Sequence, residues 1–113
     1  MTATPSPPGA ILERLFEVIE GRRAADPETS YVAKLFAAGS GAIAAKVGEE
    51  AIELVIAHTK GLGPETVRES ADLLFHMMVL WADAGIRPGD VLGELEAREG
   101  LSGLEEKRRR GDA

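Results

Sequence analysis

The chain has 113 residues, 44% of them hydrophobic and 28% charged, which is typical of one globular domain of roughly 100–150 residues. Thirteen basic and nineteen acidic residues give a formal net charge of -6, so charge favours neither a nucleic-acid partner nor an anionic membrane. The sequence contains no cysteine, which excludes disulfide bridges, thiolate metal sites and cysteine nucleophiles. Any metal ligand is therefore an oxygen or a histidine nitrogen.

We expect the chain to divide into a short lead-in, one helical domain and a polar tail. Residues 1–8 read MTATPSPP, with neither the basic stretch nor the apolar run of a secretory signal. They predict a flexible lead-in over residues 1–9 and a cytoplasmic protein. The helical domain is predicted over residues 10–100 and the polar tail over residues 101–113, whose basic end is typical of a solvated terminus rather than a nucleic-acid patch. No run approaches the ~18 apolar residues of a membrane span.

Apolar residues recur at helical spacing along the predicted domain, and capping residues mark the helix ends. The first apolar stripe lies on residues 10–21. Ser30 is the predicted N-cap of a short helix over residues 31–38, which Gly39 ends, and Gly41 is expected to form a flexible joint. Further helices are predicted over residues 42–60, 64–83 and 88–98. One face of the first of these carries four apolar residues: Val47, Ala51, Leu54 and Val55.

The fold is predicted to be an all-α bundle of four to five helices, because no segment shows the two-residue alternation of a strand. The helix over residues 64–83 is apolar on almost every side, so it is expected in the middle of the bundle. Its Met77, Met78 and Trp81 are assigned to packing. One protomer offers too little cover for this helix, and we therefore expect a homodimer with a shared core.

Acidic residues gather on facing sides of two consecutive predicted helices. Glu49, Glu50 and Glu53 fall within an arc of roughly 100°, at about 100° per residue, and Lys46 lies inside that arc. On the next helix Glu69 and Asp72 are three residues apart, and His76 falls on the same side. The short loop between the two helices predicts an antiparallel pair, so the two acidic groups face each other.

The acidic run alone is usually a solvated helix face. Glu69 and Asp72, however, lie on the most apolar helix, where a solvated face is hard to find. Several carboxylates in a partly buried space repel one another unless a cation neutralises them. Magnesium prefers oxygen ligands and commonly links carboxylates to substrate phosphates, so the pattern favours a magnesium site and a polyphosphate substrate.

These motifs resemble the signature of the all-α, MazG-like nucleoside triphosphate pyrophosphatases, and more specifically that of the phosphoribosyl-ATP pyrophosphatases of histidine biosynthesis. Two of them carry the acidic residues, K-V-G-E-E-A-I-E over 46–53 and E-S-A-D-L-L-F-H over 69–76. The segments S-Y-x-x-K-L over 30–35 and S-G-L-E-E-K over 102–107 make the resemblance specific to the histidine pathway. The likeness covers nearly everything from Leu12 to Arg110.

The resemblance implies magnesium-dependent hydrolysis of 1-(5-phosphoribosyl)-ATP to 1-(5-phosphoribosyl)-AMP and pyrophosphate. It implies four magnesium ligands, two from each helix: Glu50, Glu53, Glu69 and Asp72. Glu49 either binds a second ion or positions the attacking water. Substrate phosphates are assigned to Lys34, Lys46 and His76.

Several of these assignments have alternatives. Each lysine is otherwise a surface residue with a solvated ammonium group, and His76 otherwise stabilises Asp72. Tyr31 is expected to pack, with its hydroxyl satisfied, and contact with the ligand is the alternative. Ala42 departs from the family, which often has arginine there, so that phosphate contact is missing and Lys34, Lys46 or the tail arginines take its place.

Two other functions fit parts of the pattern. A general housekeeping nucleoside triphosphate pyrophosphatase uses the same metal site with a different base and sugar pocket. A non-catalytic helical dimerisation module has the same acidic faces, either solvated or bound to a basic partner. The module predicts neither magnesium-dependent stabilisation nor pyrophosphate release.

Overall fold

The computed structural model describes residues 7–100 and 103–111, and every regular element in these residues is a helix. The predicted all-α fold is confirmed. In chain order the helices are α1 (Ala10–Arg22), α2 (Tyr31–Ala38), α3 (Ser40–Thr59), α4 (Gly63–Ala84), α5 (Pro88–Arg98) and α6 (Gly103–Arg110). The first five follow the predicted ranges closely. Helix α6 lies in the predicted polar tail and was not expected, while most of the lead-in and Ser102 lie outside the described residues.

Local capping explains where α2 and α3 begin. Ser30 has extended backbone, and its hydroxyl oxygen accepts a hydrogen bond of 3.2 Å from the Ala33 N–H, as an N-cap does. The joint between α2 and α3 is Gly39, whose φ of 96° lies in the region that favours glycine. The expectation for Gly41 was wrong, because this residue lies inside the first turn of α3.

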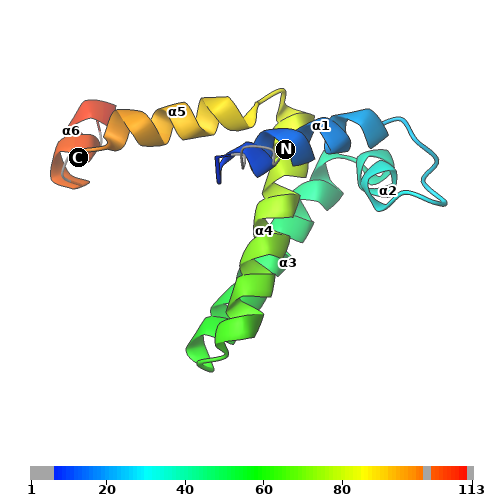
Figure 1. The fold of residues 1–113 in the computed structure, drawn as a ribbon, viewed down its shortest axis with the longest axis horizontal. Helices are drawn as coiled ribbons and strands as arrows, with labels where there is room; N and C mark the ends of the chain where they lie inside the picture. Colours follow the sequence, from blue (N-terminus) through cyan, green and yellow to red (C-terminus); the bar gives the residue numbers. More distant parts are fainter. Residues whose placement is uncertain (1–6, 101–102, 112–113) are drawn as a thin grey trace, which may run out of the picture.

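The long helices α3 and α4 form an antiparallel hairpin, and α1 and α2 pack across one end of it (Figure 1). The Ser40 hydroxyl donates a 2.7 Å hydrogen bond to the Asp83 carboxylate, which ties the start of α3 to the end of α4. At this end lie the core residues Phe16, Ile19, Val32, Leu35, Ile43, Met78, Val79, Trp81 and Ala82. Met77 packs against this core, so the packing roles expected for Met77, Met78 and Trp81 are confirmed.

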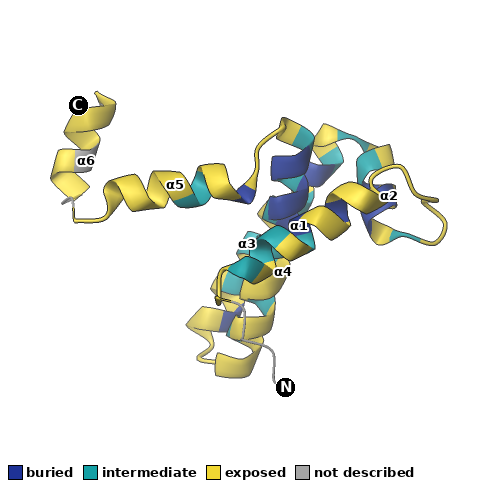
Figure 2. Cartoon of the chain, turned by 45° about the horizontal axis from the view of Figure 1, so that its top comes forward, coloured by how far each residue is buried: buried dark blue, intermediate teal, exposed yellow. Residues whose placement is uncertain are grey.

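The other end of the hairpin has little cover within one protomer (Figure 2). On α3, Ile52, Val55 and Ile56 are 61%, 59% and 46% exposed, and Val67 on α4 is 70% exposed. Val55 belongs to the apolar face predicted for this helix and is nevertheless exposed. It lies at the edge of the stripe that Val47, Ala51 and Leu54 form, and these three residues are half-buried.

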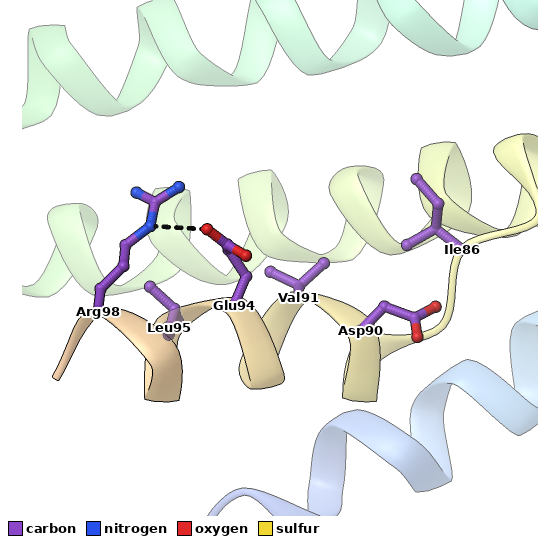
Figure 3. A pocket seen from close by; sticks show the side chains of 6 residues that line it. All are labelled: Ile86, Asp90, Val91, Glu94, Leu95 and Arg98. Atoms are coloured by element: carbon purple, nitrogen blue, oxygen red, sulfur yellow. Dashed lines mark hydrogen bonds and ion pairs between the residues drawn. The ribbon is translucent and has the colours of Figure 1, made fainter. Parts of the chain in front are cut away.

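Helix α5 extends away from the hairpin and carries α6 at its far end (Figure 1). Arg87, directly before α5, holds it to α1 through ion pairs with Glu17 at 2.8 Å and Glu13 at 3.3 Å. Beyond this anchor, α5 borders an open cavity of about 430 Å³ whose apolar side chains are Ile86, Val91 and Leu95 (Figure 3). Among the described residues, no helix is both long and apolar enough to cross a membrane.

Candidate metal and substrate site

Three of the predicted ligands meet between α3 and α4. One carboxylate oxygen from each of Glu50, Glu69 and Asp72 lies within 4.8 Å of the other two. The hairpin explains this meeting, because antiparallel neighbours bring the middle of α3 opposite the first half of α4. We call these three residues the carboxylate cluster.

Two oxygens of the carboxylate cluster are buried without a hydrogen-bond partner among the described residues, Oε2 of Glu50 and Oε2 of Glu69. Glu50 is only 7% exposed. Carboxylates rarely lie in such a place without a compensating group, because each loses its hydration there. Hard oxygen donors that converge in this way suit a divalent cation such as magnesium. The side chains present therefore fit the metal that the motifs predict.

Glu53, the fourth predicted ligand, lies beside Glu69 and outside the cluster of three. The pKa of Glu69 is raised, and the largest cause is desolvation of its carboxylate. The negative charge of Glu53 and a hydrogen bond with Glu53 raise this pKa further, and the negative charges of Asp72 and Glu50 have smaller effects in the same direction. This crowding of negative charge favours proton or cation uptake. Glu53 is itself exposed, so the structure places it at the rim.

Lys46 lies one turn before Glu50 on α3, and Glu49 directly precedes Glu50. The Lys46 ammonium is 3.2 Å from Oε2 of Glu49 and 3.7 Å from Oε1 of Glu50. Its hydrogen bond to Glu49 is the main reason that the pKa of Lys46 is raised, so this lysine stays charged. Glu49 is largely exposed and takes no part in the cluster of three, which leaves its second oxygen accessible.

His76 is buried, and both of its ring nitrogens are engaged. Nδ1 lies 2.7 Å from the Asp72 carbonyl oxygen, and Nε2 lies 2.8 Å from the Tyr31 hydroxyl. A carbonyl only accepts, so Nδ1 carries the proton, and in the neutral ring Nε2 accepts from Tyr31. Burial is the main cause that raises the pKa of Tyr31 and keeps this hydroxyl a donor. The geometry favours a role for His76 in holding α2 to α4 at Asp72 over contact with a phosphate.

A groove of about 410 Å³ runs between α2 and α3, next to the cluster. We call it the α2–α3 groove. Its lining residues are Tyr31, Lys34, Leu35, Ala38, Ala42, Ala45, Lys46 and Glu49. Ala42, the departure from the family pattern, therefore lies in the same groove as both lysines that were expected to replace an arginine at that position.

A second groove of about 200 Å³ lies on the other side of the cluster, toward the tip of the hairpin. Glu53 and Glu69 line it together with Lys60 at the end of α3. Sequence reasoning did not single out Lys60. The signal was its spacing, because it follows Glu53 by seven residues, two helical turns further along the same face.

Replacing Glu69 by glutamine is expected to stabilise the metal-free protein. The amide keeps the size of the side chain and removes one negative charge from a crowded site, so the melting temperature in chelator should rise by a few degrees. The same variant should lose most of the stabilisation that excess magnesium gives the unmodified protein, about 2.7 kcal/mol at a hundredfold excess over Kd. Thermal unfolding with chelator and with magnesium tests both the higher melting temperature and the smaller stabilisation by magnesium. A lower melting temperature in chelator would contradict the repulsion.

Sequence comparisons identify the family of this chain. The model of the phosphoribosyl-ATP pyrophosphohydrolase family matches residues 12–99. A phosphoribosyl-ATP pyrophosphatase of Azospirillum brasilense is 54% identical over 101 residues, which cover 89% of this chain and 91% of the relative. Its counterpart in Parvibaculum lavamentivorans is 56% identical over 101 residues, covering 89% and 93%. The chain belongs to the phosphoribosyl-ATP pyrophosphohydrolase family.

Proposed function

We propose that this protein hydrolyses 1-(5-phosphoribosyl)-ATP to 1-(5-phosphoribosyl)-AMP and pyrophosphate, the second step of L-histidine biosynthesis, with magnesium as its metal. Membership of the family supports the reaction. The observation that carries the proposal for the site is the carboxylate cluster, in which two buried oxygens lack partners among the described residues. A triphosphate bound with magnesium supplies the positive ion that these carboxylates need and the anhydride bond to be broken.

Glu50, Glu69 and Asp72 are the proposed magnesium ligands, and Glu53 completes the set from the rim. Magnesium bound there neutralises charge on the phosphate oxygens. The buried position of Glu50 fixes its carboxylate, and the Lys46 ammonium at 3.7 Å from Oε1 limits how far that carboxylate can turn. A rigid ligand set holds the triphosphate in one place, which phosphoryl transfer requires more than covalent help.

Water is the nucleophile in this mechanism. Its oxygen forms a bond to one phosphorus of the α–β anhydride while the bond from that phosphorus to the bridging oxygen breaks, and the proton of the water is released to solvent. Glu49 is proposed to orient this water, because one of its oxygens is held by Lys46 and the side chain is largely exposed. Lys46 is proposed to contact phosphate oxygens from the same position.

The decisive experiment measures pyrophosphate release from phosphoribosyl-ATP, ATP and a set of deoxynucleoside triphosphates, with magnesium and with chelator. We expect rapid magnesium-dependent release from phosphoribosyl-ATP alone. Turnover of ordinary triphosphates at similar rates would favour the housekeeping enzyme and overturn the substrate assignment. No release from any compound would favour the non-catalytic module.

We further propose that the protein is a homodimer. One protomer leaves Ile52, Val55 and Ile56 exposed in a stripe on α3, with Val67 exposed on α4. Apolar surface gathered in this way is typical of a shared helical core. A second hairpin packed on this face buries the stripe and supplies the cover that α4 lacks in a single protomer.

A further inference from the structure

The α2–α3 groove differs in chemistry from the carboxylate cluster beside it. Four of its lining residues are apolar, Leu35, Ala38, Ala42 and Ala45, and Tyr31 and two lysines line it as well. An apolar lining with a few polar groups is typical of a site that binds a planar organic group rather than a bare polyphosphate. Any role of this groove in substrate binding rests on the proposed function, and it concerns the part of the substrate that does not react.

The two lysines of the groove are not equivalent. The Lys46 ammonium is already paired with Glu49 and Glu50. No carboxylate of the described residues lies within 4.0 Å of the Lys34 ammonium, and Lys34 is exposed on α2. Lys34 is therefore the cation of the groove that remains available to an anionic group of a ligand.

The Tyr31 ring is held in one orientation. Its hydroxyl is bonded to the buried His76, the ring lies stacked with Phe75 at a centroid distance of 6.4 Å, and it meets His76 edge-on at 5.7 Å. Tyr31 as a whole is nevertheless 47% exposed, and it lines the groove. A fixed, half-exposed aromatic ring offers a surface on which a purine stacks at little entropic cost.

The groove and the cluster are adjacent along α3, because Lys46 lines the groove and its ammonium lies 3.7 Å from Oε1 of Glu50. Ala42 and Glu50 are eight residues apart, which at a rise of 1.5 Å per residue is about 12 Å. A ligand whose triphosphate lies at the carboxylate cluster can therefore extend along the groove toward α2. Phosphoribosyl-ATP differs from ATP by a ribose 5-phosphate on the adenine, at the end of the molecule opposite to the triphosphate.

We propose that the α2–α3 groove binds the phosphoribosyl-adenine part of the substrate, with the Tyr31 ring against the adenine and Lys34 on the phosphate of the added ribose. Lys34 is then the residue that separates phosphoribosyl-ATP from ordinary ATP. It acts in binding and not in the chemical step, since the reacting phosphates lie at the cluster.

Binding of the two monophosphates tests this without turnover. Calorimetry should compare phosphoribosyl-AMP with AMP on the unmodified dimer and on Lys34→Met, Lys34→Arg and Arg14→Met. Lys34→Met should weaken the binding of phosphoribosyl-AMP by roughly 10- to 100-fold and leave the binding of AMP unchanged, as expected for the loss of one charge-assisted contact. Lys34→Arg should keep most of the difference in affinity between phosphoribosyl-AMP and AMP that the unmodified protein shows. Arg14, an exposed cation on α1 outside both grooves, serves as the charge control.

Equal weakening of both monophosphates by Lys34→Met, or no change in either, would overturn the assignment. Steady-state kinetics give a second measure, in which Lys34→Met should raise KM for phosphoribosyl-ATP and leave kcat within about twofold. Tyr31→Leu should weaken the binding of AMP and of phosphoribosyl-AMP alike, and Tyr31→Phe should weaken both far less, because the ring is kept and only its bond to His76 is lost. If the unmodified protein hydrolyses no phosphoribosyl-ATP, the proposed function fails, whereas an active protein that is insensitive at Lys34 refutes only the groove assignment.

Discussion

Replacing Glu50 by glutamine is expected to lower kcat for phosphoribosyl-ATP hydrolysis on the order of a thousandfold. Glu50 is the most buried member of the carboxylate cluster, and its Oε2 has no other partner among the described residues. The amide has nearly the same shape as the carboxylate but no charge. Its NH2 group also points N–H donors toward the proposed cation site, and these donors repel a cation. Pyrophosphate release at saturating substrate and magnesium measures the effect.

Two controls separate this loss from unfolding. Glu28→Gln removes the same charge from an exposed loop position and should leave kcat unchanged. The circular dichroism spectrum of Glu50→Gln should equal that of the unmodified protein, because the amide relieves repulsion within the cluster rather than adding to it. Asp72→Asn should give a comparable loss. Full activity in Glu50→Gln would refute the assignment of this residue as a ligand.

Replacing Val55 by aspartate is expected to separate the proposed homodimer into protomers of 12.0 kDa. The side chain belongs to the exposed stripe on α3, together with Ile52 and Ile56, and contributes little to the core of its own protomer. A carboxylate buried there in a dimer loses its hydration without gaining a partner, which costs several kcal/mol. Size-exclusion chromatography with light scattering reads the mass directly.

The matched control for this variant is Val18→Asp on α1, where a valine is 43% exposed away from the hairpin. It should leave the mass of the dimer unchanged. Helix content of Val55→Asp should be largely kept, since the core at the other end of the hairpin does not involve this residue. A dimer that persists in Val55→Asp, with unchanged dissociation constant, would place the interface elsewhere.

Local signals were sufficient to predict most of the helices. Ser30, Gly39 and Gly85 act on their own backbone, through a cap or a left-handed turn, so their effect does not depend on tertiary packing. The meeting of Glu50 with Glu69 and Asp72 was also predictable, because a short loop forces consecutive helices to lie antiparallel. Glu53 remained at the rim, since only the geometry of the hairpin decides which oxygens converge.

Contacts that depend on how α2 crosses the hairpin could not be predicted. The bond between Tyr31 and His76 joins residues 45 positions apart, and it requires the turn that Gly39 makes between α2 and α3. The exposure of Val55 has a similar origin. A helical pattern shows which residues share a face but not how much of that face a single protomer covers.

The projecting position of α5 has a consequence for local stability. Its packing onto the body is mainly through its first turns, where Arg87 and Val91 contact α1 and the core. An isolated helix of 11 residues is marginal in water. In a single protomer, the amide hydrogens after Val91 should therefore exchange with solvent far faster than those of α4 near Val79, whose exchange requires global unfolding. Exchange in α5 that slows as the protein concentration rises would report that a second copy covers this helix.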